Sequence, residues 1–302
     1  MAAEIPFRRD YAFEYGVIEQ VAPAVRRVVA RNPSPFTFHG TGTYIIGRGR
    51  VAVIDPGPDM DDHVAAILDG LSGEQVTHLL VTHTHRDHSP ACRAVQAATG
   101  ARTYGYGPHG AGKLEQDVKV EEGGDADFVP DVEVRHGDVI EGNGWSVECV
   151  YTPGHTSNHI CYQFREQKIL FSGDHVMAWS TSVISPPDGD MAHYMESLNL
   201  LLERDDAVYW PTHGPCIEDP KQFVRGFITH RHVRERQILA CLSDGVDKIS
   251  DMVPLMYREL PGALYPAAAR SVFATVIYLV RQGKLKCEGE LSIDARYAND
   301  GS

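Results

Sequence analysis

Two features are scarce in this sequence of 302 residues, and each absence excludes a class of protein. The six cysteines are widely separated and form no Cys-x-x-Cys pair, which favours reduced, buried thiols over a disulfide framework. No run of residues approaches the ~20 apolar positions of a membrane-spanning helix, and no apolar signal segment follows the N-terminal arginines. We therefore expect a cytoplasmic protein with no membrane partner.

Positive charge is also in short supply. The formal net charge is -13, so the surface as a whole repels polyanions such as nucleic acid. The excess of negative charge lies in the first 225 residues, because residues 226–302 carry ten Lys or Arg against nine Asp or Glu. The apolar share of 43% and the charged share of 23% are those of an ordinary globular protein, so disorder is not expected.

Strand and helix patterns interleave up to about residue 225. Two β-branched runs, 44–46 and 51–54, flank a Gly-Arg-Gly turn and predict a hairpin that ends at Asp55-Pro56-Gly57. Residues 61–70 have the spacing of an amphipathic helix. Further strands are expected at 76–82, 132–134, 146–152, 160–164, 169–171 and 208–210, and a helix at 194–202. This alternation predicts an α/β class with layered sheets.

The pattern changes to helices after residue 225. Three helical stretches cover residues 227–242, 250–260 and 265–283, the last opened by Pro266 and closed by Gly283. A candidate wing hairpin follows at residues 284–293. We therefore expect two domains, 1–225 and 226–302, the second resembling a winged helix. Its near-zero charge favours packing or contact within a homodimer over nucleic-acid binding.

The stretch VTHTHRDHSP, residues 81–90, gathers three histidines and an aspartate where a buried strand opens into a loop. These residues are His83, His85, Asp87 and His88. Imidazole and carboxylate groups are good ligands for zinc and similar ions, and burying four of them is costly unless positive charge lies among them. Three later Pro/Gly-rich turns, each after an apolar strand, add His155, Asp174 and His213. The pattern predicts a metal site rather than a solvated turn.

This ordered set resembles the signature of the metallo-β-lactamase fold superfamily: HxHxDH, a histidine in TPGHT, an aspartate in SGD and a histidine in HGP, over residues 40–216. The resemblance implies an αββα sandwich with a dinuclear site at one edge of its sheets. One metal would be held by His83, His85 and His155, the other by Asp87, His88 and His213, with Asp174 as the bridge. The donors suit two zinc ions, and without a thiolate they also accept iron or manganese.

The same resemblance implies a hydrolytic mechanism. A hydroxide that bridges the two metals attacks a carbonyl or phosphorus, and Asp87 is the expected catalytic residue that orients it. An aspartate at position 174 is the pattern of glyoxalase II, lactonases and ribonuclease Z, whereas true β-lactamases usually carry cysteine or serine there. Together with the winged helix, the motifs are most similar to the β-lactamase-like branch that includes a mitochondrial endoribonuclease.

Two substrate classes remain open at this point. A small ester, thioester or lactone needs only a pocket, which suits the acidic main domain, and residues 180–195 are long enough to form its rim with His193 and Tyr194 as candidate substrate contacts. A phosphodiesterase acting on single-stranded RNA needs a basic approach to the metals. Its candidate side chains lie in the tail: Arg231, Arg234, Arg236, Lys284 and Lys286. We favour the small-molecule substrate.

Two further interpretations follow from the sequence. His159, four residues after His155, is expected to support the ligands rather than to bind metal. A non-enzymatic reading, in which a degenerate member binds a partner through its winged helix, is disfavoured because degenerate members lose ligands and all seven are present here.

Overall fold

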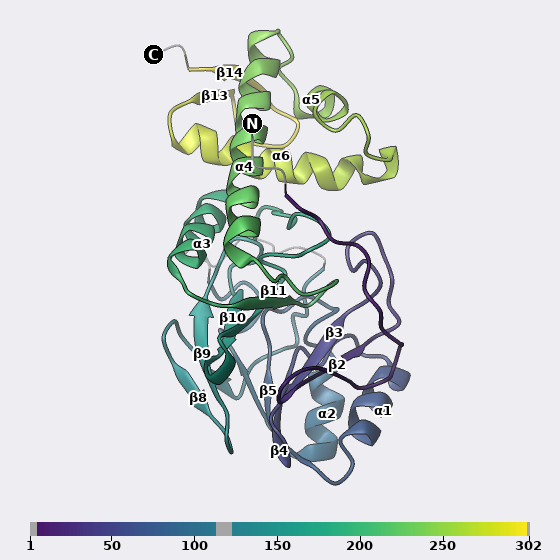
Figure 1. Cartoon of the computed structure of the whole chain (residues 1–302). Helices are drawn as coiled ribbons and strands as arrows, with labels where there is room; N and C mark the ends of the chain where they lie inside the picture. The colour runs from purple at the N-terminus through teal and green to yellow at the C-terminus, as the bar shows by residue number, and fades with distance from the viewer. Residues whose placement is uncertain (1–4, 113–122, 301–302) are drawn as a thin grey trace.

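The computed structural model describes residues 5–112 and 123–300, and Figure 1 shows a layered sandwich below a helical module. The first sheet holds seven strands in chain order, namely β1 (Glu19–Ala22), β2 (Val25–Val29), β3 (Gly42–Ile46), β4 (Arg50–Ile54), β5 (Gln75–Leu80), β6 (Arg102–Gly105) and β7 (Val132–Glu133). Its strands pair antiparallel up to β4 and parallel from β4 to β7. The hairpin expected around residues 44–54 is present as β3 and β4.

The second sheet has five strands in the order β12-β11-β10-β9-β8. Their bounds are β8 (Val139–Glu141), β9 (Ser146–Tyr151), β10 (Ile160–Phe164), β11 (Ile169–Gly173) and β12 (Val208–Pro211). Because β10 is antiparallel to both of its neighbours and β12 is parallel to β11, strands β9, β11 and β12 all run in the same direction. Their carboxyl ends therefore meet at one edge of the sheet.

Three apolar layers hold the sandwich together. Between the sheets lies a core that includes Tyr44, Tyr162 and Phe171. Helices α1 (Asp61–Gly70) and α2 (Cys92–Thr99) cover the outer face of the first sheet. Helix α3 (Met191–Glu203) and the first half of α4 (Pro220–Ser243) cover the outer face of the second. The predicted αββα sandwich is confirmed.

The C-terminal module contains α4, α5 (Ile249–Met256), α6 (Tyr265–Arg281) and a hairpin of β13 (Leu285–Glu288) and β14 (Arg296–Asn299). Short 3₁₀ turns lie at Arg165–Gln167 and Gly262–Leu264. Pro266 stands in the first turn of α6, and Gly283 takes a φ of 70° directly after the helix, as expected. Figure 1 shows this module above the sandwich, reached along α4.

Helix α4 runs without a break through residue 225, where the sequence suggested a boundary. Phe223 and Phe227 in its first half belong to the core of the second sheet, whereas Ile238 and Cys241 in its second half belong to the core of the C-terminal module. One helix thus serves two cores, and the division of the chain into domains 1–225 and 226–302 stays a prediction.

The composition led to two expectations, one about the cysteines and one about membrane-spanning segments. All six cysteines are free thiols, as the spacing indicated. The expectation that no segment is apolar enough to span a membrane is wrong by length and composition, because the helical stretch Gly262–Arg281 meets that criterion. Such a helix is weak evidence for a membrane, and here Val272, Val276 and Leu279 are buried in the core of the C-terminal module. Core packing accounts for part of the apolar composition, since 33% of the most apolar window of the stretch is buried.

The shared helix makes a testable prediction about stability. Phe227→Ala and Ile238→Ala each remove a fully buried side chain from one of the two cores, so each lowers the free energy of unfolding by about 3 kcal/mol. Urea denaturation followed by far-ultraviolet circular dichroism, which reports on the helices of both parts, measures the change. The control Leu255→Ala, at a position 48% exposed on α5, changes it by less than about 0.5 kcal/mol. A loss below about 1 kcal/mol in either core variant would contradict the packing described.

Candidate metal centre

The chemistry-bearing residues follow strand ends at one edge of the sandwich. His83 comes three residues after β5, Asp174 directly after β11, and His213 two residues after β12. The two sheets are tied together at this edge, since the Tyr44 hydroxyl donates to the carbonyl of Pro211 at 2.6 Å. The sheet architecture therefore brings residues from distant parts of the sequence to one place.

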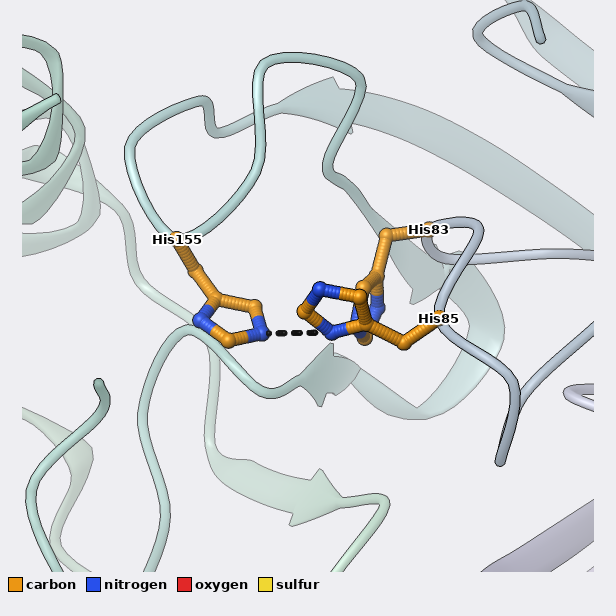
Figure 2. Close-up of side chains that lie close together, drawn as sticks. All are labelled: His83, His85 and His155. Carbon is orange, nitrogen blue, oxygen red and sulfur yellow. Dashed lines mark hydrogen bonds between the residues drawn. The ribbon is translucent and has the colours of Figure 1, made fainter. Parts of the chain in front are cut away.

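His83, His85 and His155 form the first group of donors. Figure 2 shows their rings converging from two loops. Nε2 of His83 lies 2.9 Å from Nδ1 of His85, and Nε2 of His155 lies 3.2 Å from the same atom. His85 thus offers its Nδ1, whereas the other two offer Nε2. Three nitrogens facing a common point are the donor arrangement that a divalent ion requires.

Asp87, His88 and His213 form the second group. Nε2 of His213 lies 3.1 Å from Oδ2 of Asp87, and Nε2 of His88 lies 3.6 Å from the same oxygen. Donor atoms of each group lie within 4.8 Å of one another. The structure therefore contains a second candidate metal site beside the first.

Asp174 lies between the two groups. Its Oδ2 is 3.7 Å from Nε2 of His155 and 3.7 Å from Nε2 of His88, and its Oδ1 is 3.5 Å from Nε2 of His213. One carboxylate therefore faces members of both groups, which is the position that a bridging ligand occupies. All seven residues singled out in the sequence come together, and their roles as ligands remain predictions.

Hydrogen bonds on the far side of the rings fix which nitrogen faces the centre. Nδ1 of His88 donates to Oδ2 of Asp55 at 2.9 Å, Nδ1 of His155 to the Val183 carbonyl at 2.6 Å, and Nδ1 of His213 to the Gly40 carbonyl at 3.1 Å. Each ring that donates through Nδ1 presents an unprotonated Nε2 to the centre when neutral.

Some of the inward atoms have no hydrogen-bond partner in the described part of the chain. These are Nε2 of His88, Nε2 of His213 and Oδ1 of Asp174, all buried. Buried polar atoms are normally paired, and leaving one unpaired costs about 1–3 kcal/mol. The residues present therefore fit a pair of divalent metal ions.

The electrostatics of the cluster agree with that fit. Burial lowers the pKa of His83 well below its ordinary value and that of His85 to about 3, so both rings are neutral near pH 7 and able to bind metal. Burial alone would also lower the pKa of His88, but Asp87, Asp174 and Asp55 raise it well above its ordinary value. The carboxylates thus make the centre attractive to positive charge.

Asp55 is a residue of the site that the sequence interpretation missed. Its buried carboxylate accepts hydrogen bonds from Thr82 through the backbone N–H and the hydroxyl, both at 2.8 Å, from the Thr212 hydroxyl at 2.9 Å, and from His88. It therefore joins the ends of β4, β5 and β12. The sequence showed an Asp-Pro-Gly stretch after a strand, but this stretch predicted only a turn.

His159 and Ser182 support Asp174 from behind. Nε2 of His159 accepts from the backbone N–H of Asp174 at 3.2 Å, and its Nδ1 lies 2.9 Å from the Thr152 hydroxyl. The Ser182 hydroxyl lies 2.6 Å from the Asp174 carbonyl, and Arg231 of α4 donates to the Ser182 carbonyl at 2.6 Å. These contacts are those expected of supporting residues, and they extend from the metal site to α4.

Four of the seven donors, His85, Asp87, His155 and Asp174, form the floor of a cavity of about 530 Å³. Its other walls combine apolar side chains with polar ones, Arg86 and Arg270 among them. Four large side chains supply that apolar lining: Phe36, Met177, Val183 and Trp179. Trp179 is stacked on Phe38, with ring centroids 4.8 Å apart. The cavity can therefore hold an apolar group against the donor cluster.

Comparison with known proteins agrees with this geometry. A family model described as the Metallo-beta-lactamase superfamily matches residues 37–213. The chain belongs to the metallo-β-lactamase superfamily. A second model, the Beta-lactamase associated winged helix domain, matches residues 249–294 and identifies the C-terminal module. The protein is thus a member of a hydrolase superfamily with an appended winged helix.

Individual relatives cover most of the chain. A protein named Beta-lactamase-like protein 2 homolog from Drosophila melanogaster is 32% identical over 89% of this chain and 92% of its own length. A protein from a Cryptosporiopsis species, named Atrochrysone carboxyl ACP thioesterase dmxR1, is 30% identical over 74% of this chain and 65% of its own. The crystal structure of a Beta-lactamase domain protein from Burkholderia ambifaria shares the fold, with a TM-score of 0.78 at 21% identity over 96% of this chain and 95% of that one.

Of the two substrate contacts expected from the sequence, Tyr194 needs correction. Tyr194 is fully buried, and its hydroxyl donates to the His175 carbonyl at 2.8 Å, so it lies in the core and cannot contact substrate in this conformation. His193 is exposed and lines a second cavity, beside α6, rather than the one over the donors, and its role as a substrate contact stays a prediction. Helical periodicity explains both outcomes, because neighbouring residues at the start of α3 point in different directions.

Asp55 gives a prediction about metal affinity. In Asp55→Asn an amide can replace the oxygen that accepts from His88, and the ring then loses the partner that orients it. We expect metal affinity to fall by about 10–100-fold. Competition titration of the metal-free protein with a zinc-binding dye measures it. Asp59→Asn, at an exposed aspartate in the same turn, is the control, and equal affinity in the two variants would refute the role given to Asp55.

Proposed function

We propose that this protein is a dinuclear metal-dependent hydrolase of a small ester, thioester or lactone, and that a thioester is the substrate best supported. The observation that carries the proposal is the convergence of seven donors, four of which line a cavity with an apolar wall: His83, His85, Asp87, His88, His155, Asp174 and His213. A carbonyl group presented by an acyl chain in this cavity would lie beside the donors. Relatives named as thioesterases support the choice among the three substrate types.

Two zinc ions are the proposed cofactors, with iron or manganese as alternatives, because the donors are nitrogen and oxygen without a thiolate. His83, His85 and His155 would hold one ion, Asp87, His88 and His213 the other, and Asp174 would face both. When bound, such ions polarise a substrate carbonyl and lower the pKa of water.

The chain's own residues supply orientation and exclude bulk water. The Asp87 side chain is 26% exposed, whereas that of Asp174 is 11% exposed, so Asp87 is the carboxylate better placed to accept a hydrogen bond from the attacking nucleophile in the cavity. Met177 and Trp179 form an apolar wall against which an acyl group can pack. Removing solvent from this space strengthens every electrostatic interaction near the donors.

Hydrolysis of single-stranded RNA is less well supported. Four of the five basic side chains expected to guide RNA have partners within the protein. Arg231 is buried and donates to the Ser182 carbonyl, and Arg234 donates to the Met256 carbonyl at 2.8 Å. The other two pairs are Lys284 with Glu235 and Lys286 with Asp300. These contacts reduce the positive charge available for a polyanion.

Metal removal and one substitution test the proposed hydrolase. The purified protein should contain about two equivalents of metal, and prolonged chelation should abolish thioester hydrolysis until zinc is restored. Asp87→Asn should lower kcat/KM by about 10²–10⁴-fold, with an unchanged circular dichroism spectrum. Asp59→Asn is the control with wild-type rates. Full activity after verified removal of metal, or no turnover across an ester, thioester and lactone panel, would overturn the proposal.

Salt dependence separates the two substrate classes. Turnover of an uncharged thioester should change little between about 50 and 200 mM salt, whereas binding of RNA through many phosphates falls steeply over that range. Fluorogenic single-stranded RNA should not be cleaved faster by the wild type than by Asp87→Asn. RNA cleavage that is lost in Asp87→Asn and suppressed by salt would instead identify a nuclease.

A further inference from the structure

A second cavity, of about 590 Å³, is walled on one side by α6 of the winged-helix module, and sequence neighbours of its lining residues border the cavity over the donors, called here the metal cavity. On the hydrolase side, Ser185 lines the metal cavity and the next residue, Pro186, lines the second one. On α6, Arg270 lines the metal cavity and Phe273, one turn further on, lines the second. One residue of loop and one turn of helix therefore separate the two spaces.

A single stripe of α6 borders both cavities. Its members are spaced as the residues of one helical face: Arg270, Phe273, Ala274, Ile277 and Arg281. At about 1.5 Å of rise per residue, the stripe extends roughly 16 Å from the metal cavity to the far end of the second one. The two spaces can thus hold different parts of one elongated molecule.

The second cavity, like the metal cavity, has a lining that mixes apolar and polar side chains. Phe273, Ile277 and Leu291 supply apolar surface. Polar groups lie among them, including Ser157 and the ion pair between Arg281 and Asp190 at 2.5 Å. Such a lining suits a chain that alternates methylene groups with amides better than it suits a hydrocarbon.

We propose that the second cavity binds the thiol-side arm of the substrate, a long amide-containing chain of the pantetheine type. The inference rests on the proposed function. With the thioester carbonyl beside His155 and Asp174, the acyl group packs against the apolar wall of the metal cavity and the arm runs along α6. At the far end of the second cavity Arg281 is paired with Asp190, so the lining offers hydrogen-bonding groups for amides rather than an unpaired cation.

The reaction balances with water as the only co-substrate. The water oxygen bonds to the acyl carbon, the carbon–sulfur bond breaks, and sulfur leaves with the bonding electrons and takes up a proton. The products are a carboxylic acid in the metal cavity and a free thiol arm in the second cavity. The arm belongs either to a free molecule, as in coenzyme A, or to a carrier protein, and the two sources share this chemistry.

The test compares thioesters that have the same acyl group and different arms. Wild-type protein loaded with zinc is assayed with the hexanoyl thioesters of N-acetylcysteamine, coenzyme A and a phosphopantetheinylated carrier protein. We expect a KM about tenfold lower for a long arm than for N-acetylcysteamine, as binding in a second cavity requires. Preference for coenzyme A or for the carrier protein identifies the source of the arm. Equal KM values for all three would overturn the proposal.

A cavity-filling variant localises the effect. Ile277→Trp places a large ring in the second cavity and should raise KM for the long-arm thioester about tenfold while leaving kcat and the N-acetylcysteamine KM unchanged. Leu255→Trp adds the same ring at an exposed position of α5 and should behave as the wild type. Urea denaturation checks that both variants are folded. If Ile277→Trp raised KM equally for the short-arm and the long-arm thioester, the assignment would be contradicted.

Direct binding separates this inference from the proposed function. Calorimetric titration of the zinc-loaded protein with free coenzyme A needs no turnover. Binding to the wild type and its loss in Ile277→Trp support the cavity assignment even if no thioester is hydrolysed, an outcome that would refute only the hydrolase proposal. Absence of coenzyme A binding to the wild type would overturn the arm site itself.

Discussion

Burial of unpaired donor atoms is the constraint on which the rest of this structure depends. Nε2 of His88, Nε2 of His213 and Oδ1 of Asp174 have no hydrogen-bond partner among the described residues. Their combined cost, at about 1–3 kcal/mol for each atom, is comparable to much of the net stability of a domain. A cation bound among these atoms would satisfy them and the carboxylates beside them. The hydrogen bonds on the far side of the histidine rings support this arrangement, because they orient the nitrogen lone pairs toward one point.

In the sandwich, the ends of the strands hold the donor residues close together. Parallel neighbours such as β4 and β5, or β11 and β12, bring their carboxyl ends to one edge, where short turns can place side chains within a few ångströms. Asp55 joins three of these ends through Thr82, Thr212 and His88, so the position of a ligand ring depends on the register of both sheets. A small change in sheet packing would therefore be felt at the metal centre. The same dependence explains why a turn residue that binds no metal itself belongs to the site.

The sequence predicted the layers, and it singled out the seven residues that the structure brings together, because both have local signatures. Four of the seven lie in one loop after a buried strand, three lie at Pro/Gly-rich turns after other strands, and period and length distinguish α1 or α3 from the strands. Asp55 was not recognised, because its role consists of contacts to residues 27 to 157 positions away. Tyr194 was placed at the rim because the loop before it is long, but the direction of a side chain at a helix start depends on the tertiary packing. The sequence also did not predict that α6 lines both cavities, since no local pattern indicates what packs against a helix face.

The winged-helix module is part of the site for a physical reason that goes beyond adjacency. Helix α4 belongs to two cores, and its Arg231, 5% exposed and stacked near the Tyr194 ring, donates to the Ser182 carbonyl. The hydroxyl of Ser182 in turn lies against the Asp174 carbonyl. A displacement of the module along α4 would disturb this series of contacts and shift the Asp174 carboxylate, which faces both groups of donors. Selection for activity would then act on both parts together. The similarity to the Drosophila protein covers 89% of this chain and so extends through both parts.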